Sequence, residues 1–218
     1  MKRKTIGFVM LLLITVGTGL MGCGTVRPTK QTAGAMVQKQ LYQKYGIKTE
    51  VDKVHLESGT YAFSQEAYDV ELHIKGDRTR NFTASVTASG DSYVDNYSKL
   101  IYGGRLERIV KDQIDKIDGY SAEYQLSYHM IEAAYTRKDD WKKYILDAKV
   151  GADVTLTAPS DETKEKIAKE MTPFLKKLRK TGFSASITVY QDDKKILFAA
   201  SSPDTREIGY DEMLRWFR

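Results

Sequence analysis

The single cysteine of the chain, Cys23, is the residue whose type and position most directly indicate chemistry. One cysteine cannot form an intramolecular disulfide or a zinc site built from cysteines, so its thiol is free for another use. The segment before it begins with three basic residues at positions 2–4 and continues as an apolar run over residues 6–16. A membrane-spanning helix needs roughly 20 apolar residues, more than this run supplies. We therefore expect residues 1–22 to be a secretory signal peptide.

The four residues Leu20-Met21-Gly22-Cys23 resemble the lipobox of bacterial lipoproteins, with Met21 a mild departure from the usual small or aliphatic residue. The resemblance implies that a diacylglycerol is attached to Cys23 through a thioether and that the chain is cleaved between Gly22 and Cys23. It implies no other cofactor. Two acyl chains anchor a protein stably, because each buried CH₂ contributes roughly 0.8 kcal/mol. We expect a protein anchored by lipid on the extracytoplasmic face of the cell membrane, with residues 23–32 as a polar tether.

The rest of the sequence has few residues spaced for catalysis or metal binding. The three histidines, His55, His73 and His129, are far apart, and alternation places His73 and His129 on polar strand faces, where we expect exposed side chains. The segments that start at Gly119 and Gly182 begin like a Gly-x-Ser-x-Gly nucleophile elbow but lack its second glycine. The sequence therefore predicts no catalytic residues and no metal ligands.

Tyrosine is the one unusual feature of the composition, with 14 residues against seven phenylalanines and two tryptophans. Tyr120, Tyr124 and Tyr128 share one face of a predicted strand. They could form a stacking surface for a glycan or peptide, but a sheet face packed on a helix is the favoured interpretation. The basic residues at 176–180 could similarly contact anionic headgroups or wall polymers, but a solvated helix end is favoured.

Apolar periodicity predicts the elements of the first half, residues 33–118. They are a helix over 33–45 ending at Gly46, strands over 51–56, 68–74 and 82–88, and a helix over 100–117. The last two strands predict a hairpin. Two adjacent glycines, Gly103 and Gly104, weaken the first turns of the second helix, which could begin only after them.

The second half, residues 119–218, starts with a segment that permits two interpretations. Strict alternation over 120–130 predicts a strand, although a helix would also align its tyrosines. The next elements are a helix over 141–145 capped by Asp139 or Asp140 and a strand over 150–156. A helix capped by Ser160 follows and reaches residue 180. Strands over 183–189 and 196–200 are then joined by a turn at 191–194, and a last helix covers 208–217.

This order, αβββα followed by βαβαββα, predicts an α+β fold with antiparallel hairpins packed against helices. The two halves could be two small lobes that meet near residues 117–120. The part after the signal peptide resembles small exported α+β lipoproteins of Gram-positive bacteria, through its helix end at 41–46 (Leu-Tyr-Gln-Lys-Tyr-Gly) and the segment 91–97 (Asp-Ser-Tyr-Val-Asp-Asn-Tyr) before a helix. That resemblance covers roughly half the chain and implies no activity.

The composition is that of a globular protein, at 41% hydrophobic and 29% charged residues. The formal charge of +5 includes three basic residues of the signal peptide, so it is poor evidence for nucleic-acid binding and we expect none. We expect a non-catalytic binding or accessory protein at the cell surface, whose partners are the membrane and a surface protein or wall polymer. The alternatives are a surface hydrolase with a site built from dispersed residues, and a small-ligand receptor.

Overall fold

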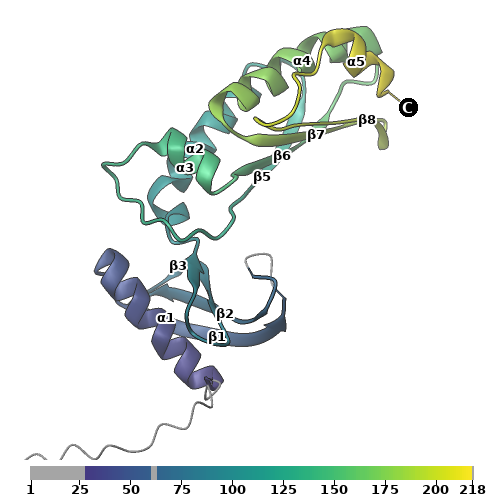
Figure 1. The fold of residues 1–218 in the computed structure, drawn as a ribbon. Coiled ribbons are helices and arrows are strands. Elements are labelled where there is room, and N and C mark those ends of the chain that lie inside the picture. Colours follow the sequence, from purple (N-terminus) through teal and green to yellow (C-terminus); the bar gives the residue numbers. More distant parts are fainter. Residues whose placement is uncertain (1–27, 60–62, 218) are drawn as a thin grey trace, which may run out of the picture.

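The computed structural model describes residues 28–59 and 63–217. Its elements, shown in Figure 1, are α1 (Lys30–Tyr45), β1 (Thr49–Ser58), β2 (Glu66–Ile74), β3 (Asp77–Thr87), β4 (Tyr93–Asp95), α2 (Lys99–Ile114), β5 (Ser121–Ser127), α3 (Trp141–Asp147), β6 (Gly151–Thr157), α4 (Lys164–Thr181), β7 (Ser184–Gln191), β8 (Lys194–Ser201) and α5 (Tyr210–Arg215). The strands form two four-stranded sheets, β1-β2-β3-β4 and β5-β6-β7-β8. The expected α+β fold with antiparallel hairpins is therefore confirmed.

The first sheet is antiparallel throughout, and α1 packs on one of its faces. The helix begins at Lys30, inside the segment expected to be tether, because the side chain of Thr29 accepts the backbone N–H of Thr32 and caps it. It ends, as predicted, at Gly46, whose φ of 69° is the left-handed conformation that glycine adopts readily. Its buried residues share one core with β2 and β3: Ala33, Val37, Leu41, Tyr68, Val70, Leu72, Phe82, Ala84 and Val86.

Two features of the first half differ from the sequence predictions. β4 was not predicted, because a three-residue strand is too short to show alternation. The second helix begins before the glycine pair and not after it: α2 starts at Lys99 and includes both Gly103 and Gly104. Gly103 is buried, and a Cβ there would lie 3.5 Å from the hydroxyl of Tyr128, so the missing side chain allows close packing.

The second sheet contains the predicted strand over 120–130, as β5, and the predicted final hairpin, β7–β8. At the hairpin turn Asp192 and Asp193 both have positive φ, as a two-residue type I′ turn requires. β6 and β7 are parallel and are connected through α4. That helix is capped by Thr163 rather than by Ser160, whose hydroxyl instead donates to Asp192.

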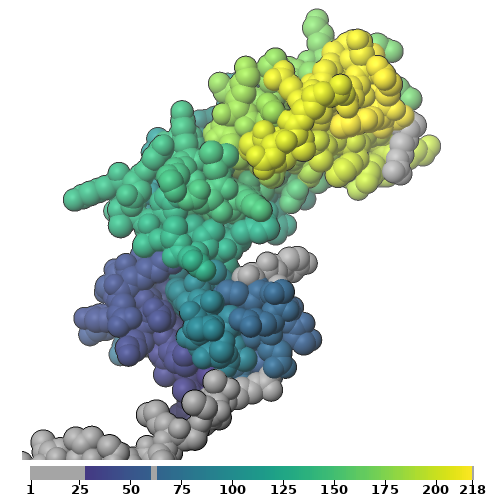
Figure 2. Space-filling view, in the orientation of Figure 1, coloured from purple at the N-terminus to yellow at the C-terminus, as the bar shows by residue number. Residues whose placement is uncertain are grey.

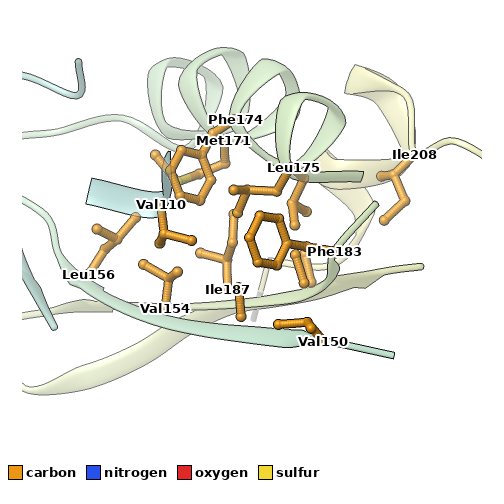
Figure 3. Close-up of a cluster of buried hydrophobic side chains, with 14 of the residues drawn as sticks. Val110, Val150, Val154, Leu156, Met171, Phe174, Leu175, Phe183, Ile187 and Ile208 are labelled. Atoms are coloured by element: carbon orange, nitrogen blue, oxygen red, sulfur yellow. The ribbon is translucent and has the colours of Figure 1, made fainter. Parts of the chain in front are cut away.

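The core of the second half lies between this sheet and α4 (Figure 3). Its largest fully buried side chains include Leu156 of β6, Met171 and Leu175 of α4, and Phe183 before β7. The buried residues of α2 join the same core: Tyr102, Leu106 and Val110. The sequence pattern predicts this helix as part of the first half, residues 33–118, so the structure corrects that boundary. In the space-filling view the chain forms two bodies, and the teal residues from the middle of the sequence lie where they touch (Figure 2).

Candidate functional site

The open face of the second sheet contains a hollow of about 420 Å³. α4 and α5 lie on the opposite side of the sheet (Figure 1). Side chains alternate along a strand, so Val154 and Ile187 point into the core while Asp153 and Ser186 point away from it. The hollow lies at one end of this face, where β5 and β8 end and where β6 and β7 begin.

Small hydroxyl side chains line most of the hollow. Four of them have hydrogen-bond partners: Ser186 Oγ donates to Asp153 Oδ1 at 2.6 Å, Ser184 Oγ lies 3.5 Å from Ser202 Oγ, and Thr205 Oγ1 donates to the backbone oxygen of Ser202 at 2.9 Å. The hydroxyl residues of the lining are Ser127, Ser184, Ser186, Ser201, Ser202 and Thr205. A hydroxyl both donates and accepts hydrogen bonds. This lining therefore suits a ligand that carries several polar groups of both kinds.

Gly151 keeps the floor of the hollow open. A Cβ at this position would lie 2.2 Å from Ser127 Oγ, closer than real Cβ atoms approach another heavy atom. Gly151 is paired with Ser127 on β5 and with Ser184 on β7, so three strands meet at this point without a bulky side chain. Any larger residue at position 151 would displace the Ser127 hydroxyl.

The ionisable residues that line the hollow are Lys149, His129 and Asp153. Lys149 follows the end of α3 and has a φ of 42°, in the left-handed region that side chains other than glycine rarely adopt. The backbone N–H groups of Lys149 and Val150 donate to Leu146 and Ile145 and so close the helix end. Lys149 and His129 are exposed, so both side chains are accessible to a ligand.

One rim of the hollow is held by Arg179 of α4. Its guanidinium donates to the backbone oxygens of Ser202, Pro203 and Thr205, at 3.1, 3.3 and 2.6 Å. Arg179 belongs to the basic stretch 176–180 of the sequence analysis, where Lys176 also has a partner, Glu207, at 2.5 Å. Both side chains therefore hold the segment that follows β8.

The tyrosines singled out in the sequence lie on the other side of the sheet. Tyr120, Tyr124 and Tyr128 alternate with the polar residues of β5 and point toward the helices, since Ala122 between them packs against the second core. Burial raises the pKa of Tyr128 to about 12. Tyr124 is the most exposed of the three, at 37%. The favoured interpretation, a sheet face packed against helices, agrees with this position, and a ligand-binding role for these tyrosines stays a prediction.

The histidines differ from one another. His129 is exposed as expected and lines the hollow, a role that its sequence position did not indicate. The expectation that His73 is exposed is wrong: it is only 3% exposed. Its ring nitrogens lie 2.8 Å from Asp52 Oδ2 and 3.1 Å from Glu50 Oε2, so two carboxylates of β1 cover it.

Some predicted groups lie outside the described residues, namely Leu20, Gly22 and Cys23 of the lipobox-like segment. Within residues 28–59 and 63–217, no cluster of three His, Cys, Asp or Glu side chains could hold a metal ion. None of the helices in that part of the chain is long and apolar enough to cross a membrane.

No family model matches the chain. A search of curated proteins also found no significant match. Among solved structures, the chain is similar to a DUF5037 family protein from Ruminococcus gnavus ATCC 29149, with 16% sequence identity over 72% of this chain and 74% of that chain, and a TM-score of 0.36. A similarity this low carries no argument about ligand or activity.

Proposed function

We propose that the chain is a lipid-anchored extracytoplasmic protein that binds a ligand at the cell surface without transforming it. The observation that carries the proposal is Cys23, the single cysteine, placed after Leu20-Met21-Gly22 and an export-type segment. A thioether-linked diacylglycerol on this residue would supply two acyl chains, enough for stable anchoring.

The start of the folded part supports this proposal. Thr29, the capping residue of α1, follows Cys23 by only six residues. An extended chain of that length spans at most about 20 Å. The first sheet would therefore lie close to the membrane surface. The hollow lies on the second sheet, in the half of the molecule away from the N-terminus of α1 (Figure 1), where a ligand outside the membrane could reach it.

The contacts in the hollow favour binding over hydrolysis. Ser186 donates its hydroxyl hydrogen to Asp153, and a carboxylate is a much weaker base near neutral pH than the histidine that usually activates a nucleophilic serine. We therefore place a ligand-binding surface here, for a wall polymer or another surface molecule.

The anchor is tested by expressing the full chain in a bacterial host fed an alkyne analogue of palmitate, followed by fractionation of the membranes. We expect the wild-type chain to be labelled and to remain with the membranes, and Cys23→Ser to lose the label and leave them. Gly22→Ala keeps a small residue at the cleavage site and should be labelled like the wild type. Equal labelling and equal membrane retention of Cys23→Ser would overturn the proposal.

A further inference from the structure

After α3, Lys149 takes the left-handed conformation that glycine takes at the ends of α1 and α4. α1 ends on Gly46 with φ 69°, and α4 ends on Gly182 with φ 108°. α3 is followed by Lys149 with φ 42°. The left-handed conformation is strained for a residue with a Cβ and is free for glycine. No hydrogen bond or ion pair in the described chain uses the Lys149 ammonium group, so internal contacts do not explain the lysine.

The position of Lys149 does explain it. It is one of the residues that line the hollow on the open face of the second sheet, and its side chain is exposed. The hydroxyl groups there can bind a polar ligand, and the Asp153 carboxylate can accept further hydrogen bonds. Lys149 adds a positive charge, and His129 adds a second when protonated. Lys149 is thus a positive group beside the Asp153 carboxylate, so an acidic group of a ligand would pair with Lys149 while hydroxyls of the same ligand donate to Asp153.

An exposed aromatic ring lies beside the hollow on the same face. Phe198 of β8 is 47% exposed and is paired with Thr188. This pair lies two residues along the strands from the pair of Ala200 and Ser186, which line the hollow. Residues two apart on a strand point to the same face and lie roughly 7 Å apart. An aromatic ring next to hydrogen-bonding groups can pack against the apolar face of a sugar ring.

We propose that this hollow binds an anionic carbohydrate, with its acidic group at Lys149, its hydroxyls on the serine-rich floor and a ring against Phe198. A volume of about 420 Å³ falls within the range of about 300 to 1,000 Å³ that is typical of small-ligand sites. The proposal deepens the proposed function, since it names the class of ligand that the surface protein binds. It does not depend on the lipid, because a purified chain would bind in solution.

The experiment uses the full chain purified in a detergent without a sugar headgroup, with binding of digalacturonate followed by ligand-observed NMR. Cellobiose is the neutral saccharide and inorganic phosphate the simple anion. We expect digalacturonate to bind at least tenfold more tightly than either. Equal binding of cellobiose would overturn the requirement for charge. Displacement of digalacturonate by equimolar phosphate would show a simple anion site and overturn the requirement for a carbohydrate.

Lys149→Gly separates binding from folding. Glycine relieves the left-handed strain, so we expect Tm to rise by a few degrees while the affinity for digalacturonate falls at least tenfold. A residue with only a structural role would not change the two measurements in opposite directions. Unchanged affinity in this variant would overturn the proposal.

Gly151→Ala provides a second variant, because its Cβ would overlap the Ser127 hydroxyl and force this lining residue to move. We expect weaker binding, with Gly104→Ala as the matched control, since a Cβ at Gly104 meets nothing within 4 Å. Equal affinity of these two variants would contradict a binding site at this floor. Loss of lipid labelling with binding retained would instead remove only the anchor.

Discussion

The ammonium group of Lys44 lies 2.6 Å from the carboxylate of Asp95, and these two side chains are only 13% and 0% exposed. The same carboxylate accepts hydrogen bonds from the Tyr45 hydroxyl, at 3.1 Å, and from the backbone N–H of Tyr97, at 2.9 Å. The backbone of Asp95 also exchanges two hydrogen bonds with Ile131, in the segment between β5 and α3. One buried residue therefore joins α1, the first sheet and the second half of the chain.

Removal of Lys44 should destabilise the protein strongly, because it leaves the Asp95 charge buried without its partner. We expect Lys44→Met to lower the free energy of unfolding by about 3 to 5 kcal/mol in urea denaturation. Lys39→Met, at an exposed position of the same helix, is the control and should change it by less than about 0.5 kcal/mol. The double variant Lys44→Met/Asp95→Asn should lose less than the sum of the single variants. Strictly additive losses would contradict the coupling of these two residues.

His73 should make the stability of the first sheet depend on pH. Its hydrogen bond to Asp52 is the main cause that raises its pKa above the ordinary value; burial opposes this and the bond to Glu50 adds to it. Because the pKa is higher in the folded chain, the stabilisation is fully present below the unfolded value of about 6.5 and is lost as pH rises through the folded value.

The difference in Tm between the wild type and His73→Gln measures this effect. We expect it to be largest at about pH 5.5, below the unfolded pKa, and to shrink as pH is raised toward about 9, because the imidazole loses its proton as pH passes the folded pKa. His55→Gln is the control, since His55 is half-exposed and lies 3.7 Å from its nearest carboxylate, on Glu71. A Tm difference that stays the same across this range would show that His73 acts through packing alone.

His73 also shows where sequence reasoning reaches its limit. Alternation correctly assigned Leu72 and His73 to opposite faces of β2, but both are buried. Periodicity tells which residues share a face, whereas the cover of that face depends on the neighbouring strand, here on Asp52 and Glu50. The same limit holds for α2: periodicity predicts which of its residues are apolar and share a face, but it does not predict which core that face joins.

The order of elements in the second half could be predicted because its strands are long enough to alternate clearly and its last turn has a distinct signal. β4 could not, since three residues show no period. The hollow was not predicted either. Its lining comes from four strand ends and the loops beside them, and no spacing in the sequence brings Lys149 near Ser186. The left-handed conformation of Lys149, the best indication of the site, becomes visible only in the structure.

The assignment of α2 to the second core can be tested by hydrogen exchange. Leu106 is fully buried in that core, and Phe82 is 2% exposed in the first. We expect Leu106→Ala to cost about 2 to 5 kcal/mol and Phe82→Ala about 3 to 5 kcal/mol, through lost burial and the cavities that remain. Leu106→Ala should speed exchange mainly in β5–β8, and Phe82→Ala mainly in β1–β3. If each variant speeds exchange equally in both sheets, the two cores unfold as one unit and the separate assignment is wrong.

Arg179 should act on the hollow as a positioning residue, because it touches the rim from behind rather than the space that a ligand would fill. Its three hydrogen bonds hold the turn over 202–205, which carries Ser202 and Thr205 to the lining. We expect Arg179→Gln to lower the free energy of unfolding by about 1.5 to 3 kcal/mol. Backbone amides at 202–205 should exchange faster, and digalacturonate should bind severalfold more weakly.

The controls separate positioning from general loss of stability. Lys177→Gln, at an exposed position of the same helix, should change neither exchange at 202–205 nor binding. Arg179→Lys keeps the charge but loses the fork of N–H donors that spans three carbonyls, so it should restore only part of the affinity. Faster exchange in the turn together with unchanged affinity would mean that the turn's position does not matter to the ligand. In that case residues 202–205 would not belong to the proposed binding surface, which would be limited to the floor around Gly151.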